Sequence, residues 1–183
     1  GAYDRVILIS PDHFRKVDGA FGTTRAAFKT VLGAVEVDLS AVDALAASPL
    51  VRVLPTMETE HGVMAVAPFV AQFFPKAKII PVLASISSKT ADWAAMAELL
   101  EPLMTERTLV VQSTDYSHYR PAGEAVTRDQ ESIAAITARD PEAILPLLQP
   151  SHMDSKAAQY IQLALQQRAG SGPVILGNRN SLA

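Results

Sequence analysis

The chain has no cysteine among its 183 residues, which excludes disulfides, thiolate nucleophiles, cysteine-ligated zinc and iron–sulfur clusters. Any metal site must therefore use histidine, aspartate or glutamate. A surplus of positive charge is also lacking, because 16 Lys and Arg side chains stand against 19 Asp and Glu side chains, for a net charge of −3. No sequence-wide positive field exists to hold nucleic acid or an anionic membrane, so neither is expected as a partner.

Long hydrophobic runs are missing as well. Apolar stretches such as residues 79–84 fall far short of the roughly 20 residues that span a bilayer. No secretory signal pattern is visible, and we expect a cytoplasmic protein. What is present is a composition of 49% hydrophobic and 19% charged residues, typical of a folded domain with a substantial core. Without repeats or low-complexity linkers, residues 1–183 are predicted to form a single domain.

Three short apolar runs, Val6–Ile9, Ile79–Leu83 and Leu109–Val111, each lead into a polar loop. Unbroken runs of Val, Ile and Leu are typical of strands buried on both faces of a parallel sheet. Periodicity between and after these runs predicts helices over His61–Phe74, Ala91–Leu103, Arg128–Ala138, Pro141–Leu148 and Ser155–Arg168. The first of these helices is apolar on nearly all sides and is expected to pack deep against the sheet. The sequence therefore predicts an α/β fold with a central, mostly parallel sheet flanked by helices.

The stretch near residues 25–39 has a different pattern. Gly33 separates two short segments, and in the second of them Val35, Val37 and Leu39 alternate with acidic residues. Such alternation beside a glycine predicts an antiparallel hairpin. We expect this hairpin to lie outside the sheet or at its edge.

Side chains that can bind metals or move protons follow the ends of the predicted strands. His13 follows the first strand, and Asp115 and His118 follow the third. His61 opens a helix, and His152 precedes the last one. Each residue taken alone is also consistent with a structural role in a turn or cap. Because ligands of open α/β sheets gather at the carboxyl ends of strands, and imidazole binds metals and transfers protons, the group favours a ligand pocket.

Three segments resemble the motifs of one known family, in the same order. Ser10–His13 (SPDH), Glu60–Val63 (EHGV) and Ser113–His118 (STDYSH), with the strand Ile79–Val82 (IIPV), are similar to the Memo family, also called AmmeMemoRadiSam system protein B. The resemblance covers most of the chain and implies the fold of the class III extradiol dioxygenases of the LigB type. It also leads us to expect that the chain lacks the family's first strand and its His-Ala-Gly motif, which supplies a further histidine ligand.

The resemblance implies catalytic roles for three residues. His118 matches the histidine that serves as acid or base in the dioxygenases, and Asp115 stands beside it. His61 matches the histidine of the family's Glu-His motif. An imidazole near neutral pH with a carboxylate as neighbour suits such a task.

The resemblance also implies a metal site. His13 matches a metal-coordinating histidine of the family. The family's third ligand is a cysteine in Memo and a glutamate in the dioxygenases. It falls near Met153, where His152 or Asp154 is expected to substitute. Two histidines and a carboxylate suit Fe²⁺ and leave positions open for substrate and oxygen, so the expected cofactor is Fe²⁺ or another divalent metal such as Zn²⁺ or Cu²⁺, with no metal as the alternative.

Three functions are consistent with these residues. The first is a Memo-like pocket that binds a divalent metal or a small polar molecule, with non-haem iron oxidation of a small phenolic or carbonyl compound as its catalytic form. The second is a non-catalytic binding or scaffold protein, which is favoured by Met64 at the position of a motif glutamate and Met153 at that of the family's cysteine ligand. The third is a metal-dependent hydrolase.

Overall fold

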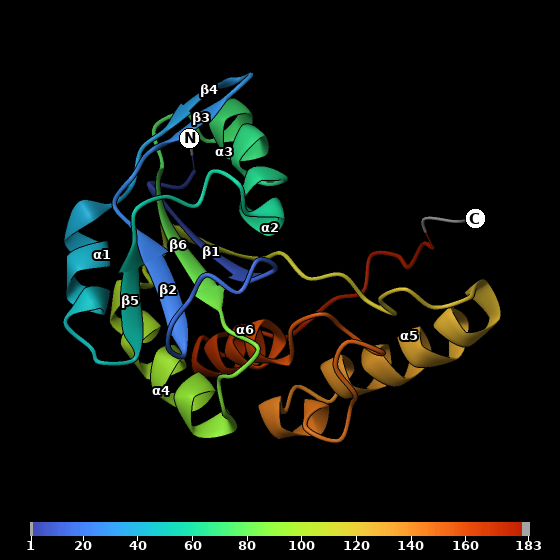
Figure 1. Cartoon of the computed structure of the whole chain (residues 1–183). Helices are drawn as coiled ribbons and strands as arrows, with labels where there is room; N and C mark the ends of the chain where they lie inside the picture. The colour runs from blue at the N-terminus through green and yellow to red at the C-terminus, as the bar shows by residue number, and fades with distance from the viewer. Residues whose placement is uncertain (1, 181–183) are drawn as a thin grey trace.

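A five-stranded sheet forms the centre of the molecule (Figure 1). The computed structural model describes residues 2–180, so the two ends of the predicted 1–183 domain, residue 1 and residues 181–183, lie outside the described residues. In spatial order the strands are β5 (Val51–Leu54), β2 (Phe21–Thr24), β6 (Lys78–Ala84), β1 (Arg5–Pro11) and β7 (Thr108–Gln112).

The three predicted apolar runs form β1, β6 and β7. β1 lies between the other two and is parallel to both, with Ile7 opposite Ile80 on one side and Val110 on the other. Every residue of β1 and β6 after the first is buried, as expected for strands covered on both faces. The predicted mostly parallel α/β sheet is confirmed.

The predicted hairpin is confirmed as well. It consists of β3 (Phe28–Thr30) and β4 (Gly33–Val35), which pair antiparallel in a two-stranded sheet of their own. Strand β2, in contrast, was not predicted. It is antiparallel to β6 and parallel to β5, and its buried Thr23 donates a hydrogen bond to the Pro81 carbonyl at 2.8 Å. That bond allows a polar residue to lie inside the sheet.

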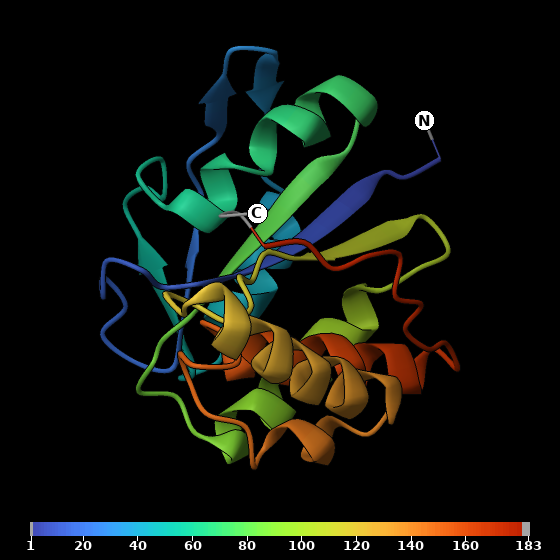
Figure 2. The same cartoon turned by 90° about the vertical axis from the view of Figure 1, so that its right-hand side faces the viewer.

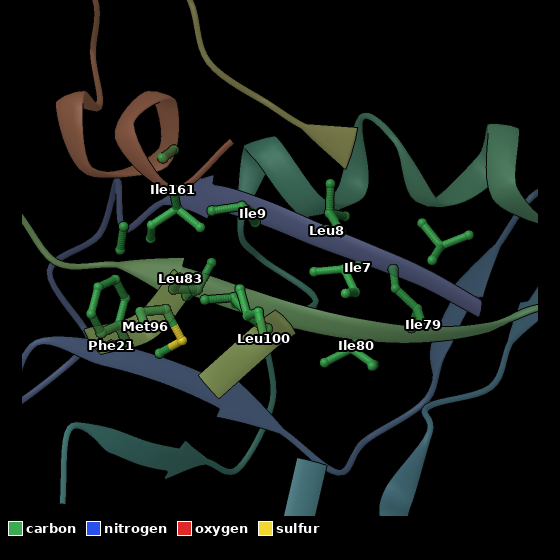
Figure 3. Packing of buried hydrophobic residues seen from close by; sticks show 14 of the residues in the cluster. Ile7, Leu8, Ile9, Phe21, Ile79, Ile80, Leu83, Met96, Leu100 and Ile161 are labelled. Atoms are coloured by element: carbon green, nitrogen blue, oxygen red, sulfur yellow. The ribbon is translucent and has the colours of Figure 1, made fainter. Parts of the chain in front are cut away.

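Helices flank the sheet. α6 packs against β1, β7 and α4, whereas α1 packs against β2 and β5, and α2 against β1. Ile9, Leu83, Leu100 and Ile161, drawn in Figure 3, belong to one cluster of buried side chains. No described helix is long and apolar enough to cross a membrane. The helices are α1 (Leu39–Ala46), α2 (His61–Met64), α3 (Ala67–Phe73), α4 (Thr90–Leu100), α5 (Ala122–Thr137) and α6 (Lys156–Arg168), with 3₁₀ turns at Glu101–Leu103 and Pro141–Ile144.

Three predicted helices differ from the structure. The helix predicted over Arg128–Ala138 is α5, which already begins at Ala122. Residues 61–74 form two helices, α2 and α3, because Pro68 in the first turn of α3 has no N–H with which to continue the hydrogen bonds of α2. Phe69 and Phe73 on α3 are 61% and 63% exposed. The prediction that this segment packs deep against the sheet is therefore wrong for the helix face that carries these two rings. The predicted helix over residues 141–148 is only a 3₁₀ turn, because Pro146 ends the hydrogen-bond ladder.

Candidate functional site

A cleft of about 470 Å³ opens where β1 and β7 end. Loops from both strands, the start of α2 and the loop before α6 meet there. Five of the six predicted site residues line the cleft: His13, His61, Asp115, His118 and Asp154.

Asp154 reaches the cleft through a short backbone pairing between two distant loops. Tyr116 and Met153 form an isolated antiparallel bridge, and the Asp154 N–H donates to the Asp115 carbonyl at 3.0 Å. Met153 is fully buried by this pairing. The cleft therefore receives Asp154, and not Met153, from the segment where the family places its third ligand.

The His13 imidazole is held by a buried carboxylate. Glu60, whose side chain is only 3% exposed, makes a short hydrogen bond with His13 Nδ1 and accepts a second one from the His13 N–H at 3.1 Å. The same carboxylate caps α2 at the Gly62 N–H. With Nδ1 engaged by a carboxylate, His13 presents Nε2 to the cleft, where it lies 3.4 Å from Asp154 Oδ2.

Three side chains form a group that could hold a metal ion. One ligand atom each of Asp115, His118 and Asp154 lies within 4.8 Å of the others. His118 Nδ1 is 3.9 Å from Asp115 Oδ2, and His13 adjoins the group through Asp154. The second oxygen of Asp154, Oδ1, is buried without a hydrogen-bond partner.

The electrostatics of Asp154 are unfavourable to its charged form. Burial raises the pKa of Asp154 above its ordinary value, and the charge of Asp115 adds to the rise. A carboxylate in this position is stabilised by an added cation, since a cation favours the ionised form.

Two aromatic rings flank the imidazoles at the rim. Phe14 meets the His61 ring edge-on with centroids 4.8 Å apart, and the 93% exposed Tyr119 lies 4.3 Å from the His118 ring. The His61 ring itself is 5.4 Å from that of His13. Sequence reasoning missed both aromatic residues and the Glu60 contact, because isolated loop residues carry no periodic signal.

The backbone around His118 has an uncommon conformation. Ser117 and Tyr119, on either side of it, have φ angles of +47° and +55°. Side chains other than glycine rarely adopt this left-handed region, and it costs on the order of 1–2 kcal/mol per residue. Strain is therefore concentrated where the loop after β7 presents His118 to the cleft.

His152 is not brought to the cleft. It is buried, its Nδ1 accepts a hydrogen bond from the Leu148 N–H at 2.9 Å, and its Nε2 lies 2.6 Å from Glu131 Oε2. Both ring nitrogens are thus engaged, and the ring joins α5 to the loop before α6.

The pair of His152 and Glu131 predicts a pH dependence of stability. The hydrogen bond from His152, aided by Arg128, lowers the pKa of Glu131 below its ordinary value of 4.5. The contribution of this pair to the stability of the fold is therefore present above that value, and it is lost as the pH falls through the lowered pKa. We expect Glu131→Gln to lower the melting temperature at neutral pH, with the difference from wild type shrinking in acid. The exposed Glu106→Gln is the control, and a difference that stays constant into strong acid would contradict the pairing.

Comparison with known proteins identifies the family of this chain. A family model described as Memo-like protein matches residues 1–172. The chain belongs to the Memo-like family. A MEMO1 family protein of Methanopyrus kandleri is 28% identical over 160 residues, which cover 81% of this chain and 54% of that relative. One of Methanothermobacter thermautotrophicus is 30% identical over 139 residues, covering 74% and 50%.

This Memo-like chain thus spans about half the length of the curated relatives it matches. Among solved structures, an uncharacterised protein from Escherichia coli K12 is similar with a TM-score of 0.52 and 18% identity, over 90% of this chain and 75% of that one. That likeness shows a shared fold. The family predicted from the three motifs is confirmed.

Proposed function

We propose that the cleft of this Memo-like protein binds a divalent metal ion. Asp154, His118 and Asp115 supply the ligand atoms, and His13 Nε2 is the fourth candidate. The observation that carries the proposal is the buried, unpartnered Oδ1 of Asp154 within this group. A buried carboxylate oxygen is costly to leave unpaired, and a cation would remove that cost.

The donor set suits an intermediate divalent metal. Imidazole nitrogens and carboxylate oxygens are the ligands of non-haem Fe²⁺ and of catalytic Zn²⁺ sites, both of which keep open positions. Glu60 contributes indirectly, because a carboxylate on the far nitrogen of a ligating histidine fixes the ring and raises its basicity.

The catalytic form of the proposal is oxidation of a small phenolic or carbonyl compound. Ferrous iron in such a set supplies open positions for a small molecule and oxygen. His61 remains free of the ligand set and faces the same cleft, so it is the residue to hold or move a proton on the bound molecule. Phe14 and Tyr119 at the rim provide flat surfaces for a ring.

Metal loading of two histidine variants tests the ligand set. We expect His13→Ala to bind Fe²⁺ about tenfold or more weakly than wild type, since it removes the one imidazole backed by a buried carboxylate. His152→Gln, at the histidine outside the cleft, is the matched control and should bind as wild type. The measurement is anaerobic titration followed by metal analysis. Equal metal content in His13→Ala and wild type would remove His13 from the site.

The other two functions give different outcomes with the same protein. Oxygen uptake that requires Fe²⁺ and a phenolic compound supports the oxidative form. Metal-dependent turnover of esters or phosphoesters without oxygen uptake would favour the hydrolase. A melting temperature that neither EDTA nor added Fe²⁺ or Zn²⁺ changes would favour the scaffold, because a ligand that prefers the native state must stabilise it.

A further inference from the structure

The buried face of α5 carries a carboxylate. Ala125, Asp129, Ser132 and Ile136 are buried on this helix, and their spacing of three or four residues puts them on one side of it. Such a face is usually apolar, and an aspartate is rarely buried without a cation beside it. Asp129 is only 7% exposed, yet the two side chains that donate hydrogen bonds to it are neutral. A polar group in this place is costly unless its contacts compensate, so these contacts indicate its role.

One oxygen of Asp129 holds the loop after β7. Its Oδ1 accepts a short hydrogen bond from the Ser117 hydroxyl, which also lies 3.1 Å from the Ala125 carbonyl, one turn earlier on α5. Figure 2 shows this yellow loop leading into α5, the orange helix in the foreground. The Ser117 N–H donates to the His152 carbonyl at 3.0 Å, and the Ser117 carbonyl accepts from the Arg120 N–H at 3.2 Å. Ser117 is therefore held by its backbone and by its side chain.

Ser117 is also the residue at which the loop needs support. Its φ of +47° lies in the left-handed region, which residues other than glycine rarely adopt. The hydrogen bond to Asp129 is made in this conformation, and hydrogen bonds to charged groups are the stronger ones. It thus offsets the cost of the backbone. The next residue is His118, which lines the metal cleft.

The other oxygen of Asp129 contacts a different part of the chain. Oδ2 accepts a hydrogen bond from Asn178 Nδ2 at 2.8 Å, which ties the segment after α6 to α5. Because each oxygen has its own donor, the contact with the loop and the contact with this segment can be removed one at a time.

We propose that Asp129 is a positioning residue for His118. Through Ser117 it keeps the loop after β7 in the left-handed turn that presents His118 to the cleft. The inference rests on the proposed function, in which His118 is a metal ligand. Asp129 is not among the described residues that line the metal cleft, so it acts through the backbone of the loop.

Four variants separate positioning from stability. Asp129→Ala removes both contacts, Ser117→Ala removes the loop contact from the other side, and Asn178→Ala removes only the contact with the segment after α6. Asp129→Asn keeps an oxygen that can accept from Ser117. In anaerobic titration we expect Asp129→Ala and Ser117→Ala to bind Fe²⁺ about tenfold more weakly than wild type, as loss of a hydrogen bond to a charged group implies. Asp129→Asn should restore the affinity, and Asn178→Ala should bind as wild type.

Hydrogen exchange of the metal-free protein gives a readout that needs no ion. The Ser117 N–H should exchange about tenfold faster in Asp129→Ala than in wild type, and at the wild-type rate in Asn178→Ala. Unchanged exchange at Ser117 in Asp129→Ala would overturn the proposal. So would an equal fall in Fe²⁺ affinity in Asp129→Ala and Asn178→Ala, which would show a role in stability alone. If the wild type binds no metal, the proposed function fails, and exchange alone decides whether Asp129 holds the loop.

Discussion

Replacing Asp154 by alanine is expected to weaken divalent metal binding by about a thousandfold, which corresponds to about 4 kcal/mol. Asp154 is the proposed ligand that would join both parts of the site, because it lies in the group with Asp115 and His118 and also 3.4 Å from His13 Nε2. Without Asp154, the side chains of His13, Asp115 and His118 would no longer be linked through one bound cation. Anaerobic Fe²⁺ titration measures the effect, and wild-type affinity in Asp154→Ala would place the metal elsewhere.

Asp154→Asn serves as a second variant. It should lower the affinity for the metal and raise the melting temperature of the metal-free protein. Burial raises the pKa of Asp154, so in the folded protein the charged form is disfavoured. The wild type therefore loses stability as the pH rises from 3.8, the ordinary pKa of an aspartate, through the raised pKa of Asp154. Without metal, Asp154→Asn should melt higher than wild type at neutral pH, and the gap should close in acid. A lower melting point at neutral pH would contradict this.

Gly62→Ala is expected to destabilise the protein by about 3 kcal/mol and to lower its melting temperature by about 6–12 °C. A Cβ atom at Gly62 would lie 2.1 Å from Ser10 Oγ and 3.1 Å from Ser113 Oγ. Gly62 thus lies where α2 closely approaches the ends of β1 and β7, and an added Cβ would force the start of α2, with Glu60 and His61, to move. Metal affinity should fall together with stability.

A matched glycine on another helix controls for helix propensity. Gly123 of α5 has no atom within 4 Å of an added Cβ, so Gly123→Ala should stabilise by about 0.5–1 kcal/mol through backbone entropy. Combining Gly62→Ala with Ser10→Gly removes the closest contact and is expected to recover part of the loss. If Gly62→Ala melts like Gly123→Ala, α2 does not depend on this close approach.

The core of the fold was predictable because β1 and β6 are buried on both faces, β7 is half-buried, and all three contain apolar runs. β2 could not be found in this way, since its sequence, FGTT, has little apolar character and its buried threonines depend on neighbours such as Pro81. Pro68 could have predicted the break between α2 and α3, but the apolar residues around it favoured one continuous helix.

The site was predictable where it follows from strand ends. His13, Asp115 and His118 lie just beyond β1 and β7, and parallel pairing of those strands brings them together. The contact of His13 with Glu60 joins residues 47 positions apart, and Asp154 enters through the pairing of Tyr116 with Met153. Such long-range contacts depend on how loops pack, and no local pattern specifies them. The resemblance to a family located the region of Asp154 but left the choice between it and His152 open.

The central position of β1 has a consequence for the order of assembly. β1 is synthesised before both of its neighbours, yet its register is with strands that begin at residues 78 and 108. At about 5–20 residues per second, several seconds pass before β7 has been made. During that time RVILISP, an apolar segment with high β-propensity, has neither of its neighbouring strands in place, and such segments are prone to aggregate. β1 is therefore expected to be the segment of this sheet that stays unpaired longest during synthesis.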